Sequence, residues 1–346
     1  MKLSIVGTVG VPACYGGFET LVENLLDESS TSVDLTVYAS SKSYKEKTPK
    51  YKNANLKYIP LQANGVQSIP YDIWSLCHAV FKGTDNILIL GVSGAICLPF
   101  IRLFSKARIV TNIDGLEWRR DKWNSYAKRF LKLSEKIAVK YSDVVVADNK
   151  AIADYVFNEY GCDSEVIAYG GDHAIIEALN INDEGYALAL CRIEPENNVE
   201  MILSAFSQTQ KKIKFVGNWG SSEFGRTMRE RFESFDNIEI IEPIYDISTL
   251  FEMRRNCSYY VHGHSAGGTN PSLVEMMHFN KNIMAFDCNY NRATTEDKCR
   301  YFKSEDELIA KTESIGNADH GKVMREIAQR RYTWKIVKQQ YFNLFK

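Results

Sequence analysis

Short apolar stretches alternate with longer polar or amphipathic stretches along the whole chain. In the first half, apolar and β-branched residues gather at 3–6, 33–38, 56–60, 86–90, 107–111, 141–147 and 164–169. In the second half the same pattern returns at 186–190, 212–216, 238–241, 257–261 and 282–286. Strands that alternate with helical segments indicate βαβ units, because parallel strands need a crossover between them. The pattern therefore predicts an α/β fold with parallel sheets.

The segments between these strands are predicted to form helices. The length of the chain indicates how many domains it forms. Helices are expected at 18–26 and 199–209, around 250–253, and over a long terminal stretch from Arg325 to Phe345. The chain has 346 residues, 45% of them hydrophobic and 25% charged. This is enough for two cores of about 150 residues each. The turn Gly170–His173 is the expected linker between them.

Charge and cysteine usage narrow the class of protein. The formal net charge of -1 argues against a general nucleic-acid binder. The eight cysteines stand singly and form no CxxC motif, so they indicate neither a disulfide framework nor a zinc site. Residues 1–6 lead into a glycine loop and indicate a first strand, not a signal peptide, and no apolar run approaches about 18 residues. We expect a cytoplasmic protein.

The segment from His262 to Met277 carries the clearest ligand-binding pattern. It leaves a strand, crosses a loop of small residues and enters a helix. Gly267 and Gly268 let the backbone approach a ligand, Thr269 or Asn270 is suited to cap the helix, and Pro271 is suited to its first turn. Free N–H groups and the helix dipole favour a phosphate at such a place. Glu275, about one turn further on, is placed to accept hydrogen bonds from a sugar diol.

The same residues allow an interpretation without a ligand. Ser272-Leu-Val-Glu275 has the spacing of a capping box, in which the glutamate reaches back to a backbone N–H. Glycine-rich turns between a strand and a helix are common in doubly wound folds. Local sequence leaves both interpretations open.

The first half opens with a similar arrangement. Residues 7–17 form a glycine-rich loop between the first strand and the first helix, and Gly16-Gly17 with Glu23 echoes Gly267-Gly268 with Glu275. The loop lacks the GxGxxG fingerprint, which argues against a bound dinucleotide. We expect each half to present a ligand-facing loop at the carboxyl edge of its sheet.

The strand at 107–111 leads into a turn with two acidic residues. Asp114 and Glu117 lie where ligands usually meet parallel sheets. Two acids beside a glycine are also typical of a plain turn, and local sequence alone favours that interpretation.

Residues 118–140 predict a basic amphipathic helix. The segment holds eight Lys or Arg residues against Asp121 and Glu135. Its apolar stripe consists of Tyr126, Phe130, Leu133, Ile137 and Tyr141. Such a stripe is more often a core face than a membrane anchor. The excess of positive charge nevertheless suits anionic lipid head groups.

Several blocks together resemble the GT4 family of retaining glycosyltransferases, which have the GT-B fold of two Rossmann-like, doubly wound domains facing a cleft. The blocks are Arg192-Ile-Glu-Pro-Glu-Asn-Asn198, Gly217-Asn218, the helix with Glu275 and the closing segment Tyr332–Tyr341. Asn197 stands at the family's lysine position, and Gly267 at the first of its two glutamates. The blocks at 7–20, 114–118 and 267–272 are similar to the bacterial rhamnosyltransferase-type subgroup, whose N-terminal domain is DUF1972-like.

The resemblance implies a domain organisation and a reaction. It places an acceptor-side domain at 1–172, a nucleotide-sugar domain at 173–325, and at 326–346 a helix that returns to the first domain. The implied reaction moves a sugar, rhamnose from dTDP-rhamnose, to a lipid-linked oligosaccharide in capsule or cell-surface polysaccharide synthesis. It retains the anomeric configuration and uses no metal. The implied partners are the nucleotide diphosphate sugar, the lipid-linked acceptor and an anionic membrane surface at the inner face of the plasma membrane.

Roles for individual residues follow from the same resemblance. Arg192 and the N–H groups from Gly268 to Ser272 would stabilise the leaving diphosphate, and Glu275 would hold the ribose hydroxyls. Asp114 would contact the sugar or activate the acceptor. The remaining substrate-binding candidates are Gly16, Gly17, Asn218, Gly267, Gly268, Thr269, Asn270 and Ser272.

Two other functions remain compatible with the sequence. An epimerase or a phosphorylase also occurs on the GT-B scaffold, although no signature of a phosphorylase is present. A non-catalytic subunit of a polysaccharide assembly complex would explain Asn197 and Gly267 as lost catalytic positions.

Overall fold

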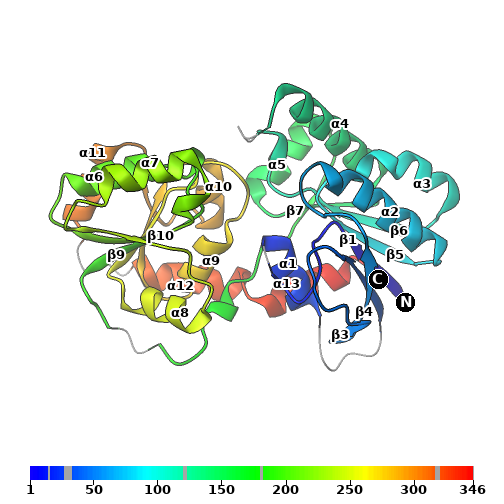
Figure 1. Cartoon of the computed structure of the whole chain (residues 1–346), viewed down its shortest axis with the longest axis horizontal. Helices are drawn as coiled ribbons and strands as arrows, with labels where there is room; N and C mark the ends of the chain where they lie inside the picture. Colours follow the sequence, from blue (N-terminus) through cyan, green and yellow to red (C-terminus); the bar gives the residue numbers. More distant parts are fainter. Residues whose placement is uncertain (15, 27–32, 120–122, 180–181, 316–319, 346) are drawn as a thin grey trace. The chain divides into compact units, whose positions relative to one another are not determined.

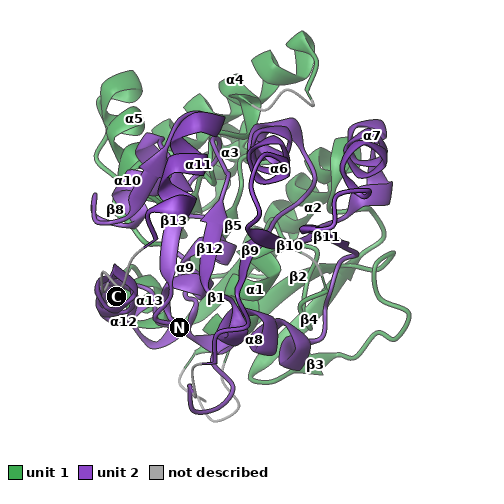
Figure 2. Cartoon of the chain, turned by 90° about the vertical axis from the view of Figure 1, so that its left-hand side faces the viewer, with its two compact units in different colours: residues 1–168, 337–346 green, residues 169–336 purple. Residues whose placement is uncertain are grey.

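A computed structural model describes residues 1–14, 16–26, 33–119, 123–179, 182–315 and 320–345. The chain divides into two compact units, coloured separately in Figure 2. The first unit contains residues 1–168 and 337–346, and the second contains residues 169–336. The division thus follows residue 168, whereas the sequence suggested residue 172, and the returning segment begins at residue 337 and not at 326.

The first unit is built on one sheet with the strand order β3-β4-β2-β1-β5-β6-β7-β8. Its strands are β1 (Lys2–Val6), β2 (Asp34–Ser40), β3 (Lys50–Tyr51), β4 (Ala54–Ile59), β5 (Asn86–Leu90), β6 (Arg108–Asn112), β7 (Val144–Ala147) and β8 (Glu165–Val166). Every pairing is parallel except that of β3 with β4. The central strand β5 is buried along its whole length, which explains why it is a continuous apolar run in the sequence.

The helices of the first unit connect these strands. They are α1 (Gly17–Leu25), α2 (Ser68–Phe81), α3 (Leu98–Phe104), α4 (Ser125–Tyr141) and α5 (Lys150–Tyr160). Helix α3 packs between α2 and α4, as Figure 1 shows. The terminal helix α13 (Trp334–Asn343) ends in this unit, where Asn112 Nδ2 donates to the buried Tyr341 hydroxyl at 2.7 Å.

The second unit repeats the design with the strand order β11-β10-β9-β12-β13-β14. Its strands are β9 (Tyr186–Leu190), β10 (Lys212–Val216), β11 (Ile238–Ile241), β12 (Tyr259–His262), β13 (Asn282–Phe286) and β14 (Arg300–Phe302), all paired in parallel. Its helices are α6 (Val199–Ser207), α7 (Glu223–Phe232), α8 (Ile247–Asn256), α9 (Pro271–Met277), α10 (Asn289–Thr294), α11 (Glu305–Glu313) and α12 (His320–Arg331). Phe206, Phe215 and Trp219 lie at the centre of its core.

Both sheets reverse their strand order next to the central strand. In the first unit the chain moves outward from β1 through β2, and later in the other direction from β5. In the second unit the same reversal lies between β9 and β12. In doubly wound sheets, ligands bind beyond the carboxyl ends of the strands at such a switch point. In this protein the loops after β1, β5, β9 and β12 lie at the two switch points.

The predicted single helix from Arg325 to Phe345 is wrong, because α12 ends at Arg331 and α13 begins at Trp334. The break has a local cause. The Trp334 N–H donates to Asp172 Oδ1 at 2.7 Å, and the Thr333 hydroxyl accepts from the Ile336 N–H at 3.4 Å. These bonds satisfy the N–H groups of a new helix start.

The predicted core face of the basic helix is also partly wrong. The residues that α4 buries are Ser134, Glu135, Ala138 and Val139, and Tyr126 and Leu133 are exposed. Small residues let α4 lie close to its neighbours, and the Ser134 hydroxyl donates to the carbonyl of Val92. The basic residues at 120 and 122 lie outside the described residues.

Candidate functional site

Two loops meet at the switch point of the second sheet and are tied together. Asn198 Nδ2, in the loop after β9, donates to the carbonyl of Gly263 at 2.7 Å. The Ser265 N–H and hydroxyl, in the loop after β12, donate to the carbonyl of Glu196 at 3.0 and 2.7 Å. A Cβ atom at Gly263 would lie 2.1 Å from the carbonyl oxygen of Asn197, so this approach requires glycine.

The turn that carries Arg192 is held by two asparagines. Asn197 is buried, and its Nδ2 donates to the carbonyl of Arg192 at 2.7 Å. Asn218 Oδ1 accepts from the Ile193 N–H at 2.7 Å, and its Nδ2 donates to the Ser221 hydroxyl at 2.7 Å. The Arg192 guanidinium itself is exposed and lies 3.6 Å from Glu194. Asn197 and Asn218 therefore position the arginine through its backbone.

The expected cap and first turn of α9 are present. Asn270 is the N-cap and its Oδ1 accepts from the Ser272 N–H at 3.0 Å, and Pro271 begins the helix. The expectation that the Ser272 N–H is available to a phosphate is therefore wrong, because Asn270 already accepts it. Thr269 is buried beside this cap. Among the described residues, the N–H groups of Gly267 and Gly268 donate no hydrogen bond.

Glu275 does not close a capping box. Its carboxylate accepts from the Arg254 guanidinium of α8, and its Oε1 lies 3.3 Å from His173 Nε2. Burial alone would raise the pKa of Glu275, but the charge of Arg254 and the hydrogen bond with His173 outweigh it and lower that pKa. Glu275 is thus an ionised, oriented carboxylate one turn into α9.

Two histidines lie at the end of β12. The rings of His262 and His264 stack with their centroids 4.5 Å apart. His262 is buried, and burial lowers its pKa to about 3, so its ring is neutral. Neither of its ring nitrogens has a hydrogen-bond partner among the described residues. The stacking of these two rings was not predicted from the sequence.

In the first unit, Glu19 of α1 holds the loop after β1. Its Oε1 accepts from the Val9 N–H at 2.7 Å and from the Thr8 hydroxyl at 2.9 Å. Burial raises the pKa of this carboxyl. A Cβ atom at Gly16, where φ is +91°, would lie 2.6 Å from Glu19 Oε2. Gly16 caps α1 and Gly17 begins it, and the missing side chain at Gly16 leaves room for Glu19, which was not among the predicted site residues.

A second buried acid supports the neighbouring loop after β5. Asp72 of α2 accepts from the Ser93 hydroxyl, and a Cβ atom at Gly94 would lie 2.3 Å from Asp72 Cβ. Burial raises the pKa of Asp72 to about 7. The adjacent Tyr71 hydroxyl donates to the carbonyl of Thr8 at 2.9 Å. One helix therefore fixes both loops at the switch point of the first sheet.

Asp114 lies in the turn after β6, at the same edge of the sheet. It has a φ of +61°, and its N–H donates to Asn112 Oδ1 at 2.9 Å. Its negative charge contributes to the raised pKa of Glu19, behind the larger effect of burial. Asp114 therefore lies near enough to Glu19 to affect its charge, whereas Glu117 accepts from Trp123 Nε1 at 3.1 Å and stabilises the turn.

The described residues contain neither a membrane-spanning helix nor a cluster of metal-binding side chains. None of the helices there combines the length and the apolar character needed to cross a bilayer. Across the same residues, no three His, Cys, Asp or Glu side chains converge on a metal-sized position.

Known proteins were compared with this chain by sequence and by structure. Residues 1–172 match the family model described as "Domain of unknown function (DUF1972)". No curated protein matches the chain by sequence.

Solved structures match the fold over nearly the whole chain. Sucrose-phosphate synthase (tll1590) from Thermosynechococcus elongatus superposes with a TM-score of 0.79 at 13% identity, covering 99% of this chain and 98% of its own. Anabaena Alr3699/HepE in complex with UDP gives 0.72 at 15% identity, with 99% and 98% covered. The lipopolysaccharide outer core galactosyltransferase WaaB in its apo form gives 0.69 at 11% identity, with 99% of both chains covered. The chain therefore has the GT-B fold, and identities this low establish the fold alone.

Proposed function

We propose that this protein is a glycosyltransferase that takes a sugar from a nucleotide diphosphate donor bound to its second unit. The proposal is supported by solved structures of the same fold: WaaB is named as a galactosyltransferase, sucrose-phosphate synthase as a synthase of a sugar phosphate, and HepE has been solved in complex with UDP-glucose. It is also supported by the switch point of the second sheet, where Arg192 and the Gly267-Gly268 loop belong to two loops tied by direct hydrogen bonds.

The observation that carries the proposal is the exposed guanidinium of Arg192 on a turn that Asn197 and Asn218 hold rigidly. A guanidinium binds phosphate oxygens with paired N–H groups. Negative charge grows on the diphosphate as its bond to the sugar breaks, and fixed donors stabilise that charge. In this proposal Arg192 and the N–H groups of Gly267 and Gly268 bind the leaving diphosphate.

Glu275 is proposed to bind the ribose hydroxyls of the donor. Arg254 and His173 orient its carboxylate, and each carboxylate oxygen keeps a lone pair for a further donor. Because its pKa is lowered, the group accepts hydrogen bonds at neutral pH. The residues after the two glycines would then have a different role from the predicted one. Thr269, Asn270 and Ser272 would shape the loop beside the nucleotide, and they would not bind the nucleotide through free N–H groups.

We base the proposed donor, acceptor and product on the resemblance to the rhamnosyltransferase-type subgroup of the GT4 family. The donor is dTDP-rhamnose, the acceptor is a hydroxyl of a lipid-linked oligosaccharide, and the product enters a capsule or another cell-surface polysaccharide. The new bond forms between the acceptor oxygen and the anomeric carbon on the face that the diphosphate leaves, so the configuration is retained. The acceptor proton passes to a diphosphate oxygen, and Asp114 contacts the acceptor or the sugar.

The reaction is proposed to need no metal ion, because Arg192 and backbone N–H groups take the place of a divalent cation on the diphosphate. This role requires that the guanidinium remain accessible, as it is in the second unit.

Membrane association is proposed through α3 and α4, which pack side by side in the first unit. On α3, Phe100, Leu103 and Phe104 are 59%, 76% and 68% exposed, and on α4 Tyr126 and Leu133 are 82% and 51% exposed. Exposed apolar clusters on a protein surface are typical of interaction sites.

Charge on α4 complements this apolar surface. Arg129 and Lys136 lie on its exposed side, near Leu133. An interfacial helix with apolar and basic residues binds the surface of an anionic bilayer. This contact would hold the first unit close to a lipid-linked acceptor.

A transfer assay tests the proposal. Purified protein is incubated with radiolabelled nucleotide sugars and a lipid-linked saccharide acceptor, and labelled lipid product is extracted and counted. Arg192→Gln should reduce transfer by about a hundredfold, the scale of losing one charged transition-state donor. Arg231→Gln is the matched control, because Arg231 is a similarly exposed arginine of the same unit. Equal activity of both variants would refute the role of Arg192.

A further inference from the structure

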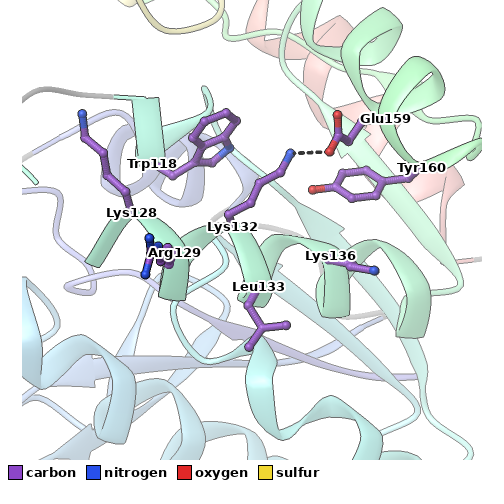
Figure 3. Close-up of a pocket in the computed structure, with 8 residues that line it drawn as sticks. All are labelled: Trp118, Lys128, Arg129, Lys132, Leu133, Lys136, Glu159 and Tyr160. Carbon is purple, nitrogen blue, oxygen red and sulfur yellow. Dashed lines mark ion pairs between the residues drawn. The ribbon is translucent and has the colours of Figure 1, made fainter. Parts of the chain in front are cut away.

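A hollow of about 530 Å³ opens on the first unit, where α4 passes the turn that ends at Arg119 and the end of α5 (Figure 3). Its cations come from α4 and are Lys128, Arg129, Lys132 and Lys136. Trp118 and Tyr160 form aromatic walls, and Glu159 is the acidic residue of the lining. Positive charge therefore exceeds negative charge in this hollow.

A buried carboxylate fixes the aromatic walls. Glu135 is fully buried and accepts from Trp118 Nε1 at 3.0 Å, from the Tyr160 hydroxyl at 2.6 Å and from the Tyr155 hydroxyl at 2.6 Å. Side chains held by such a network keep their positions when a ligand binds. The walls of the hollow are thus preorganised.

Lys132 is the cation that lies between the aromatic walls of the hollow. Its side chain extends between Trp118 and Tyr160 toward Glu159, with the ammonium 4.6 and 4.9 Å from the two ring centroids and 3.1 Å from the carboxylate (Figure 3). Burial lowers the pKa of Lys132, but its hydrogen bonds to Tyr155 and Glu159 outweigh this effect and raise it. Lys132 therefore stays charged inside the hollow.

Arg129 and Lys136 leave positive charge uncompensated. Neither makes an ion pair within the described part of the chain, and both are exposed. Like charges three and four residues apart on a helix repel one another. A bound polyanion would relieve this repulsion by forming charge-assisted hydrogen bonds with several of the cations at once.

We propose that this hollow binds the diphosphate group of the lipid-linked acceptor, an inference that rests on the proposed transferase function. A diphosphate offers several acceptor oxygens to the cations, and the faces of Trp118 and Tyr160 suit the adjoining sugar or isoprenoid carbon atoms. Trp118 comes four positions after Asp114, so their Cα atoms lie no more than about 14 Å apart. The hollow is therefore within reach of the turn that carries Asp114, as an acceptor with its diphosphate in the hollow requires.

Vesicle binding tests the proposal without requiring catalysis. Neutral phosphatidylcholine vesicles are doped either with polyprenyl diphosphate or with phosphatidylglycerol at the same negative charge, and binding is measured by cosedimentation. The wild-type protein should bind the diphosphate vesicles about tenfold more tightly than the charge-matched phosphatidylglycerol vesicles, a difference of about 1.4 kcal/mol. Equal binding to the two, or preference for phosphatidylglycerol, would overturn the proposal.

Variants then assign the binding to the hollow. Arg129→Gln with Lys136→Gln removes two cations that support no ion pair, so the fold should persist, and Lys132→Gln removes the central one. Each should abolish the preference for diphosphate. Lys140→Gln, an exposed lysine of α4 outside the hollow, should keep it. A preference that survives in all three variants would overturn the assignment.

Kinetics separate this inference from the proposed function. If the chain transfers sugar, Arg129→Gln with Lys136→Gln should raise the KM for the lipid-linked acceptor about tenfold and leave the KM for the donor unchanged. Transfer with an unchanged acceptor KM would overturn the hollow alone. Diphosphate binding without any transfer would refute the proposed function and leave the hollow as a binding site.

Discussion

Arg254 of α8 and Glu275 of α9 form an ion pair inside the second unit, with only 7% and 15% of their side chains exposed. The pair joins the helices that precede and follow β12 along the chain, and β12 is the strand that leads into the glycine loop. Glu275 was expected to act either on a ligand or on its own helix start. It instead connects α9, the helix that follows the glycine loop, to α8 through Arg254, and any ligand role is added to that connection.

We predict that Glu275→Gln destabilises the protein as well as weakening donor binding. Loss of the carboxylate leaves the buried Arg254 guanidinium without its counter-charge, which costs about 3 kcal/mol. Urea denaturation checks this value. Adding Arg254→Met to Glu275→Gln should recover much of the loss, because the unpaired charge is then gone. A single variant as stable as the wild type would contradict the importance of the pair.

Asp72 predicts a pH dependence of stability. Burial raises its pKa to about 7 in the folded protein, whereas an unfolded aspartate has a pKa of about 3.9. A raised pKa contributes stability that is complete below the unfolded value and is lost as pH rises toward the folded value. Asp72 should therefore make the protein less stable at pH 7 than at pH 5.

The matched variant is Asp72→Asn, which keeps the shape of the side chain and does not titrate. Free energies of unfolding measured between about pH 4.5 and 8 should fall more steeply for the wild type than for Asp72→Asn. Parallel curves for the two proteins would show that the folded-state pKa of Asp72 is not raised.

Removal of divalent metal ions should leave transfer unchanged. In the proposed mechanism Arg192 and the glycine N–H groups carry the charge of the diphosphate, so excess EDTA removes nothing that the reaction uses. Initial rates with and without EDTA give the comparison. Activity that disappears in EDTA and returns with magnesium or manganese would disprove the metal-free mechanism.

We predict that the exposed apolar residues of α3 contribute to membrane binding and that this contribution persists at high salt. Changing Phe100, Leu103 and Phe104 to serine should weaken binding to anionic vesicles by about tenfold and remove the binding that persists at high salt, because apolar burial is not screened. Tyr245→Ser, at an exposed aromatic residue of the second unit, is the control. If both variants bind as the wild type does, α3 does not contact the bilayer.

Much of the fold was predictable because its strands are buried. Strands β5, β9 and β13 coincide with apolar runs of the sequence, as expected for strands covered on both faces. The edge strands Lys50–Tyr51 and Arg300–Phe302 were missed, because they are short and carry charged residues. The spacing of apolar residues also predicted the wrong buried face for α4. The residues that α4 buries are Ser134, Glu135, Ala138 and Val139, and two of these are polar.

The loops of the candidate site were predictable from the sequence, but the side chains that hold these loops in place were not. The glycines at 16–17 and 267–268, the Asn270 cap and the turn of Arg192 are local patterns, and they lie at the carboxyl edges of the two sheets. The contacts of Glu275 with Arg254 and of Thr8 with Glu19 join residues 21 and 11 positions apart. Such pairs depend on how helices dock onto the sheet, and a single sequence carries no local signal for them.

Nucleotide binding by the intact chain is the most direct test of the proposed donor site. Thermal unfolding is followed with UDP, dTDP, GDP and ADP and with their sugar derivatives, for the wild type and for Arg192→Gln. At a concentration of about 100 times its dissociation constant, the correct nucleotide should stabilise the wild type by about 2.7 kcal/mol, and Arg192→Gln should reduce that gain. If no nucleotide diphosphate stabilises the wild type, or if the stabilisation is unchanged in Arg192→Gln, the second unit is not the donor site proposed here.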